Sequence, residues 1–503
     1  MLLAALLPIS LLVGACQPRE PSPVFPNQAR GGELRVLLPG EPRGFDPNAG
    51  GDEVFLILAP NLYNPLIALD VDGRLLPDLA KSWEVSDGGR TYIFHLREGV
   101  VWHDGKPFRS DDVRFTYERL KAHPSLAEEA FRRIERIETP DDLTVVVRLT
   151  EPWAPFLPTL AWNGTYILPK HIPPGGPPVG TGPFRFGGQV RGRRVVLVAN
   201  PRFHRPGPFL DRVIYRPVAD SARAADAIVR GEADTTITRV PYDRLFRLQR
   251  TPGVRVVTSP SSSRFYCAFN LTRPPLGDRR VREAINRALD RGEIVRRALF
   301  GYGAPGLGFY TPSVGWAYNG EAHVPPFDPE RARSLIREAG ARPVELLIIR
   351  LSPMTEMADL IREELGRVGL PVRIAEVPVS EWLDRIVRRR DYDMTIIAGM
   401  QGPDPENLRM RFGSGSVGGG GVPGYSSPEL DAAVAAGAAS VDLRERAQAY
   451  YRAQAVLARD LPIAPLAEAV HTTVFRANVR GLAHAEGRGL VPANDYSLVR
   501  VRP

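Results

Sequence analysis

Val344–Leu351 (VELLIIRL) opens a segment in which strand-like and helix-like patterns alternate. Apolar residues at helical spacing follow it, and Gly369 ends that helix pattern. The next patterns predict a strand over Pro371–Val377, a helix over Ser380–Arg390 and a strand over Tyr392–Ala398. This βαβαβ order predicts an α/β lobe with a largely parallel sheet.

Two loops leave the carboxyl ends of these expected strands, Arg350–Glu356 and Gly399–Asp404. In open α/β sheets, ligands bind beyond the carboxyl ends of the strands. We therefore expect both loops to face a ligand-binding cleft.

The first half of the chain has a different, strand-rich character. Asp87-Gly88 is a hairpin signal between two strand-like runs. A helix is expected over Ser110–Leu120, with Ser110 as its N-cap. Near residue 266 the pattern changes to alternating strands and helices. The sequence therefore predicts two unlike lobes.

Length and composition agree with a globular protein of more than one domain. A chain of 503 residues is too long to fold around one ordinary hydrophobic core. Its content of 43% hydrophobic and 24% charged residues is typical of globular proteins. The net charge of +8 is almost entirely arginine. Its densest cluster, Arg191–Arg194, leads into the apolar run Val195–Ala199, as a solvated hairpin end does. We expect no nucleic-acid partner, because no basic face interleaved with aromatic residues is visible.

The N-terminus has the pattern of an export signal. Leu2–Ala15 is apolar but shorter than the ~20 residues that span a bilayer, and it suits the apolar core of a signal peptide. It ends in small residues before Cys16, which resembles a bacterial lipobox. We expect 1–16 to be a lipoprotein signal peptide with Cys16 as the lipidated residue, and 17–30 to be a flexible tether. The alternative is an ordinary signal peptide that contains a cysteine.

No catalytic or metal-binding motif stands out. Gly301–Gly306 matches GxGxxG, but Pro305 stands where a phosphate-binding helix would begin. His103-Asp104-Gly105 reads as a turn rather than a metal site. We therefore expect no enzyme activity, no cofactor and no bound metal.

Several ordered motifs then identify a family. The longest covers Pro77–Phe108 and continues at Asp111–Val113. The others are GTGPF (180–184), NPRF (200–203), GEAD (231–234), the helix pattern over 278–290 and GYSSPELD (424–431). Together they resemble the bacterial extracellular solute-binding proteins of family 5, the periplasmic dipeptide-, oligopeptide- and nickel-binding components of ABC importers. The similarity spans roughly residues 31 to 480.

The resemblance implies a two-lobed periplasmic-binding-protein (Venus-flytrap) fold of the α/β class, with an extra mixed α/β subdomain in lobe I. The implied boundaries are about 31–265 for lobe I, 60–175 for its subdomain, 266–478 for lobe II and 479–503 for a C-terminal return to lobe I.

The function implied is capture of a small ligand, most readily a peptide, between the lobes and its delivery to an ABC permease. Ligand contacts from both lobes would favour the closed form. The protein would act as a monomer held by lipid to the membrane, in the periplasm or at the cell surface. Alternatives on the same fold are an opine, glycoside or metal chelate as the ligand, or a role as sensor or chaperone. An exported hydrolase is the alternative from another class.

Dipeptide-binding relatives carry a tryptophan and an amino-binding aspartate in the loop after the lobe II strand. Aligning on Asp404-Pro405 places Ala398 at the tryptophan and Gln401 at the aspartate, whereas a shifted register gives the aspartate role to Asp404. Both assignments remain open. The relatives place an arginine for the peptide carboxylate near Glu356, and Arg350 is close enough to substitute.

In lobe I, the loop with Phe45-Asp46-Pro47 and Gly50-Gly51-Asp52 is expected to approach the ligand, or else to be a surface turn. The complete set of expected ligand contacts is Phe45, Gly51, Asp52, Arg350, Glu356, Gly399, Met400, Gln401 and Asp404.

Overall fold

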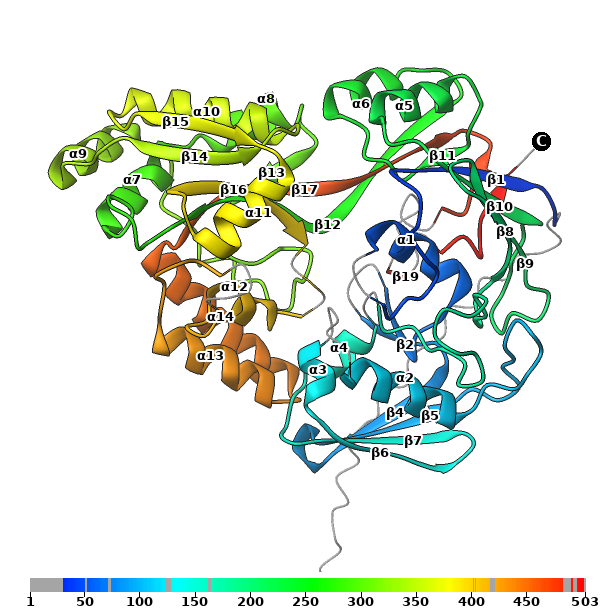
Figure 1. The fold of residues 1–503 in the computed structure, drawn as a ribbon. Coiled ribbons are helices and arrows are strands. Elements are labelled where there is room, and N and C mark those ends of the chain that lie inside the picture. Colours follow the sequence, from blue (N-terminus) through cyan, green and yellow to red (C-terminus); the bar gives the residue numbers. More distant parts are fainter. Residues whose placement is uncertain are drawn as a thin grey trace, which may run out of the picture.

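The computed structural model describes residues 30–49, 52–70, 74–122, 128–161, 164–400, 402, 404–416, 421–482, 490–491 and 495–501. Two lobes lie side by side, and the long strands β12 (Val254–Phe269) and β17 (Ile463–Arg476) run from one to the other (Figure 1). No helix among the described residues combines the length and apolarity needed to cross a membrane.

One mixed sheet passes through both lobes. Its strand order is β15-β14-β16-β12-β17-β11-β1-β10-β9-β8, with β13 also paired to β17. In lobe I, the parallel strands β10, β1 and β11 carry helix α1 on one face and helices α5 and α6 on the other (Figure 1). The lobe I elements of this layer are β1 (Glu33–Leu38), α1 (Glu53–Leu62), β8 (Phe184–Val190), β9 (Arg194–Ala199), β10 (Arg212–Pro217), α5 (Ser221–Val229), β11 (Thr235–Thr236) and α6 (Tyr242–Leu248).

A separate antiparallel sheet forms the subdomain of lobe I. The hairpin expected at Asp87-Gly88 is confirmed, because β4 and β5 pair on either side of the turn at η1 (Asp87–Gly89). Its sheet has the order β4-β5-β7-β6. The elements are β4 (Ala80–Ser86), β5 (Thr91–Leu96), α2 (Ser110–Ala122), α3 (Glu128–Arg132), β6 (Ile134–Asp141), β7 (Thr144–Leu149) and α4 (Phe156–Leu160).

Ser110 does not cap the helix it begins. Its hydroxyl donates to the carbonyl of Asp141, and Ser110 is itself the first residue of α2. The N-cap expectation at this position was therefore wrong.

The C-terminal part pairs with lobe I. β18 (Val479–Arg480) pairs with β20 (Arg500–Val501). β19 (Leu490–Val491) joins β2 (Ile67–Asp70), which pairs on its other side with β3 (Leu75–Pro77).

Lobe II confirms the βαβαβ expectation. β14 (Val344–Ile349) pairs in parallel with both β15 (Val372–Val377) and β16 (Met394–Met400). The expected helix face between the first two strands is buried, at Met357, Leu360, Ile361, Leu365 and Val368. The remaining elements are α7 (Arg279–Ala288), α8 (Arg291–Ala298), β13 (Gly303–Pro305), α9 (Pro329–Ala339), α10 (Met354–Arg367), α11 (Val379–Leu383), the π-helical turn η2 (Asp384–Arg389), α12 (Asn407–Phe412), α13 (Pro428–Ala439) and α14 (Leu443–Asp460).

Side chains of β12 alternate between two cores of lobe II, as the pleat of a strand requires. Phe265 and Cys267 face the core that α7, α8 and α10 cover. Tyr266 and Ala268 face the core formed with α12, α13 and α14. Arg264, two residues before Tyr266, lies on this second face.

The lobes also touch far from β12 and β17, the two crossover strands that connect them. The backbone N–H of Ala154 in lobe I donates to the carbonyl of Ala438 at 2.8 Å. Gly89 packs so closely on Val441 that a Cβ at Gly89 would lie 2.8 Å from its side chain. The two lobes therefore meet at both ends of the region between them.

Candidate ligand-binding site

The crossover strands carry an irregularity between the lobes. Pro260 pairs with Val470 and Arg264 pairs with Glu468, so residues 261–263 of β12 face only Ala469 of β17. On the other side of β17, pairing passes from β13 at Ala469 to β11 at Val474. An interruption of this kind bends and twists a strand pair locally. The sheet is therefore least regular where one lobe gives way to the other.

A cavity of 190 Å³ opens beside this irregularity. Its lining combines hydroxyl groups with a few apolar and basic side chains. The lining residues are Thr235, Thr236, Ile237, Thr238, Arg239, Val240, Tyr242, Ser261, Ser263, Ala469, Val470, His471, Thr472, Thr473, Val474, Leu482 and Tyr496. Concave sites with several polar groups between lobes are typical places for small ligands.

The carboxyl ends of the parallel strands meet at one edge of the lobe II sheet. β14 ends at Ile349 beside Val377 of β15, and β16 ends at Met400. The loops beginning at Arg350 and after Met400 therefore leave the same edge, although Gly399, expected in the second loop, is still part of β16. That both loops face a ligand-binding cleft stays a prediction.

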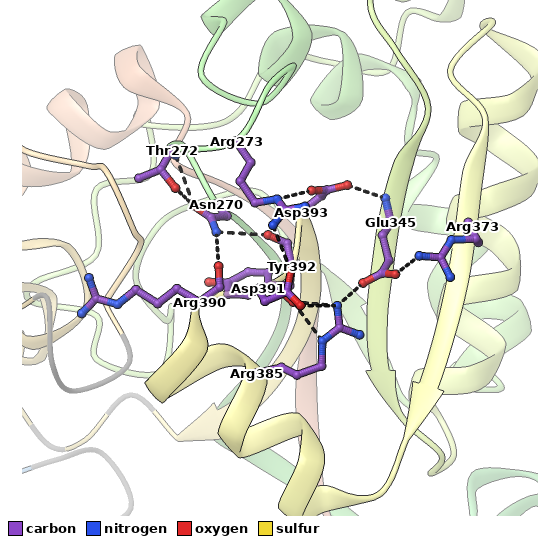
Figure 2. A network of polar contacts seen from close by, with 10 residues as sticks. All are labelled: Asn270, Thr272, Arg273, Glu345, Arg373, Arg385, Arg390, Asp391, Tyr392 and Asp393. Carbon is purple, nitrogen blue, oxygen red and sulfur yellow. Dashed lines mark hydrogen bonds and ion pairs between the residues drawn. The ribbon is translucent and has the colours of Figure 1, made fainter.

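A polar network fixes the opposite edge, at the amino ends of these strands (Figure 2). The side chain of Asn270 donates to the carbonyls of Arg390 and Tyr392, at 3.0 and 3.1 Å. Asp393 accepts from the guanidinium of Arg273 and from the backbone of Glu345. These contacts hold β12, β14 and β16 in register.

Asp404 is held by a buried ion pair. Its Oδ2 lies 2.6 Å from Nη2 of Arg446, and its Oδ1 accepts from the backbone N–H of Glu406. The pair leaves each side chain less than a tenth exposed. For Asp404 to bind a ligand ammonium, it would have to give up or share this partner. Gln401, the alternative anchor, lies outside the described residues.

Arg350 and Glu356 leave the same strand end but differ in surroundings. Arg350 is 79% exposed at its side chain and contacts Glu376 at the end of β15. Glu356 lies in the first turn of α10, and its buried Oε2 has no hydrogen-bond partner among the described residues. Their roles in ligand binding remain predictions.

The lobe I loop is held largely by its own contacts. Phe45 packs edge-on against Phe55 and Phe186, with ring centroids 5.7 and 4.8 Å away. Asp52 is the N-cap of α1 through Phe55 and also accepts from the backbone of Arg43. These contacts agree with the surface-turn alternative and leave ligand contact by Phe45 and Asp52 as a prediction.

Three expected functional residues cannot be placed. Cys16, Gly51 and Gln401 lie outside the described residues, and only the backbone of Met400 is described. Gly399 is half-buried within β16 and pairs with Arg264 of β12.

His103 has the surroundings of a structural residue. Its Nδ1 accepts from the N–H of Gly180, and its Nε2 lies 3.0 Å from the carbonyl of Gly182. Burial lowers the pKa of His103 to about 4, so the neutral ring is the stable form. Within the described ranges, no three His, Cys, Asp or Glu side chains come together as metal ligands would.

Sequence reasoning missed Arg264 and Arg411. Arg264 is fully buried in β12, where burial lowers the pKa of its guanidinium and the carboxylate of Glu468 opposes that effect. Arg411 of α12 donates to the hydroxyl of Tyr266 at 2.6 Å. The available signal was the position of Arg264 inside the apolar run that ends at Phe269, because an arginine is rarely fully buried unless it is paired.

Comparisons with known proteins give a consistent result. Residues 74–420 match the model of a family described as bacterial extracellular solute-binding proteins, family 5 Middle. Di/tripeptide-binding protein 3 of Pseudomonas aeruginosa (strain UCBPP-PA14) is 29% identical over 485 residues, covering 87% of this chain and 89% of that protein. The dipeptide-binding protein of Escherichia coli (strain K12) is 27% identical over 491 residues, covering 88% and 90%.

Solved structures show the same fold. An ABC transporter substrate-binding protein from Listeria monocytogenes has a TM-score of 0.85 at 25% identity, covering 94% of this chain and 99% of that one. A periplasmic binding protein from Helicobacter pylori in complex with the peptide STSA has a TM-score of 0.79 at 24% identity, with the same coverage. Both matches extend over the two lobes.

Proposed function

Because the chain belongs to the bacterial extracellular solute-binding proteins of family 5, we propose that it captures a short peptide between its lobes and delivers it to the permease of an ABC importer. The observation that carries this proposal is the likeness, over nearly the whole chain, to proteins named for binding di- and tripeptides. The two-lobed arrangement supports it.

The mechanism proposed is closure around the ligand. β12 and β17 connect the lobes, and their ladder is interrupted between Pro260 and Arg264. A ligand that contacts both lobes binds only the closed form fully, so its differential affinity shifts the population toward that form. The permease would then recognise the closed shape.

The membrane attachment proposed is a lipid on Cys16. The apolar run before it and the proline-rich residues after it support an exported, tethered protein in the periplasm or at the cell surface. Metabolic labelling with a radioactive fatty acid should mark the wild-type protein and leave Cys16→Ser unlabelled. Equal labelling of both would remove the anchor from this proposal.

The ligand proposal is tested by calorimetric titration with di- and tripeptides, with free amino acids and sugars as controls. Saturable binding of peptides, accompanied by a smaller radius of gyration in X-ray scattering, is the expected result. Absence of binding to every peptide would overturn the peptide assignment. Co-purification with a receptor kinase instead of a permease would favour the sensor alternative.

A further inference from the structure

The end of the β8–β9 hairpin gathers exposed positive charge. β8 is the last strand of the mixed sheet at its lobe I end (Figure 1). Arg191, Arg193 and Arg194, which we call the arginine tip, follow it within one turn, and all three are exposed. The N–H of Arg193 donates to the carbonyl of Val190 at 3.0 Å, and Gly192 has a φ of +68°, which favours glycine. A closed turn therefore presents three guanidinium groups at the edge of lobe I.

Glu41 contacts this turn but bonds to uncharged donors. Its Oε1 accepts from the side-chain amide of Gln189 at 2.8 Å and from the N–H of Gly192 at 3.0 Å. Among the described residues, no carboxylate forms an ion pair with the arginine tip. Three guanidinium groups beside one carboxylate leave an excess of positive charge, so the arginine tip is a candidate for contact with an anionic partner.

Strand pairing places the arginine tip near the start of the described chain. β1 and β9 both pair with β10, so Glu33, Arg212 and Val198 lie side by side on the three strands. Arg194 lies four residues along β9 from Val198. With ~3.4 Å per residue and ~4.8 Å between strands, Arg194 is about 17 Å from Glu33.

The chain that precedes β1 is long enough to bring the arginine tip to a membrane that holds Cys16. Arg30 lies 14 residues after Cys16, and a chain of that length spans at most about 50 Å. This reach exceeds the distance between Glu33 and the arginine tip. A lipid on Cys16 therefore keeps the arginine tip close to the headgroups, at a higher effective concentration than any freely diffusing partner has.

Anionic phospholipid headgroups match the arginine tip in charge and shape. A guanidinium group donates paired hydrogen bonds to the oxygens of a phosphate. Each arginine near an anionic bilayer strengthens binding roughly fivefold, so three give on the order of a hundredfold. A lipid chain combined with a basic patch is also a common way of holding an acylated protein on a membrane.

We propose that the arginine tip binds the anionic phospholipid headgroups of the membrane that holds Cys16. The tether and the arginine tip then attach lobe I at two points, which fixes the orientation of this lobe on the bilayer. This inference rests on the proposed lipid on Cys16 and is independent of which ligand the protein captures.

The first test measures how close the arginine tip lies to the bilayer. Val190→Cys provides a thiol for a bimane fluorophore, because Val190 is 44% exposed whereas Cys267 is buried. The lipidated protein is reconstituted in vesicles of phosphatidylcholine, with or without about 30% phosphatidylglycerol, that carry spin-labelled headgroups. Quenching should be about twofold or more stronger with phosphatidylglycerol, and ~1 M salt should abolish the difference by screening. Equal quenching in both kinds of vesicle would overturn the inference.

Matched triple variants separate the arginine tip from the net charge of the protein. The tip variant, which should lose the extra quenching, carries Arg191→Gln, Arg193→Gln and Arg194→Gln. The control variant removes three exposed arginines of lobe II and should keep it; its changes are Arg337→Gln, Arg342→Gln and Arg444→Gln. An equal loss in both variants would show that overall charge attracts the protein, and the arginine tip would then have no specific role.

A last test does not need the lipid. The full chain with Cys16→Ser is sedimented with the same two kinds of vesicle, with and without the tip variant. The intact arginine tip should strengthen binding to phosphatidylglycerol vesicles on the order of a hundredfold and leave binding to phosphatidylcholine unchanged. Such binding without fatty-acid labelling of the wild type would remove the anchor and keep the arginine tip as a membrane contact. Labelling without such binding would remove the arginine tip alone.

Discussion

The Nη2 of Arg446 lies 2.6 Å from Oδ2 of Asp404, which joins helix α14 to the loop that follows strand β16. Arg446 also stacks on Trp316 and Tyr450, with its guanidinium carbon 5.1 and 5.7 Å from the ring centres. Its Nε donates to the carbonyl of Gly437, next to the residue that contacts lobe I. One side chain therefore connects the loop after β16 to the point where the lobes touch.

Asp404→Asn should destabilise the protein by about 3 kcal/mol, because it leaves Arg446 buried without its counter-charge. Urea unfolding measures this cost. The matched variant Asp359→Asn breaks an exposed pair with Arg362 and should cost less than about 1 kcal/mol. If Asp404→Asn instead retains stability and loses peptide affinity, Asp404 is the amino anchor and its pairing with Arg446 is secondary.

Val441→Glu should weaken ligand binding several-fold without lowering stability. Val441 packs on Gly89 across the lobe contact, and a charge there disfavours the arrangement in which the lobes touch. Calorimetry and X-ray scattering with ligand give the readout. Leu443→Glu is the control, because Leu443 is comparably exposed at the start of α14. An unchanged affinity in Val441→Glu would mean that this contact makes no difference to closure.

His103 should make the protein less stable in mild acid. Burial lowers its pKa from 6.5 to about 4 in the folded state, so the folded state binds fewer protons than the unfolded state. Its contribution is complete above pH 6.5 and is lost as the pH falls toward 4, by up to about 3 kcal/mol. Denaturant titrations at pH 7 and pH 4.5 measure how much the free energy of unfolding changes between the two pH values. This change should be smaller for His103→Gln than for wild type, and an equal change in both proteins would contradict the assignment to His103.

The pH dependence of stability expected from Glu364 has the opposite sign to that expected from His103. Burial raises its pKa from 4.5 to about 7, so the folded state binds the extra proton. Stability from this group is present below pH 4.5 and is lost as the pH rises through 7, again by up to about 3 kcal/mol. Glu364→Gln should therefore be more stable than wild type at pH 8. The exposed neighbour variant Glu363→Gln should show no such gain, and a gain of equal size there would contradict the assignment to Glu364.

Local patterns explain why the lobe II sheet could be predicted. The run at Val344–Ile349 and the buried face of α10 follow the periodicities of a strand and a helix, and both depend only on nearby residues. Their parallel pairing follows from the connecting helix. The edge from which the loops at Arg350 and after Met400 leave was predictable for the same reason.

The side-chain partners at the site could not be predicted in this way. Asp404 and Arg446 are 42 positions apart, and Gly399 meets Arg264 only because β16 pairs with β12. From sequence alone, Asp52 was expected either to contact the ligand or to lie in a surface turn, and its role as the N-cap of α1 became visible only with the position of Phe55. Such contacts depend on packing between distant segments, which periodicity does not encode.

β12 and β17 are members of the sheet in both lobes. The connection between the lobes is therefore a hydrogen-bonded two-stranded ribbon rather than two separate flexible linkers. Such a ribbon resists stretching and sliding of one strand past the other. It twists more easily near residues 261–263, where the regular pairing of the two strands is interrupted. Opening should therefore follow a narrow arc, which returns the two walls to the same alignment each time a cargo molecule is taken up.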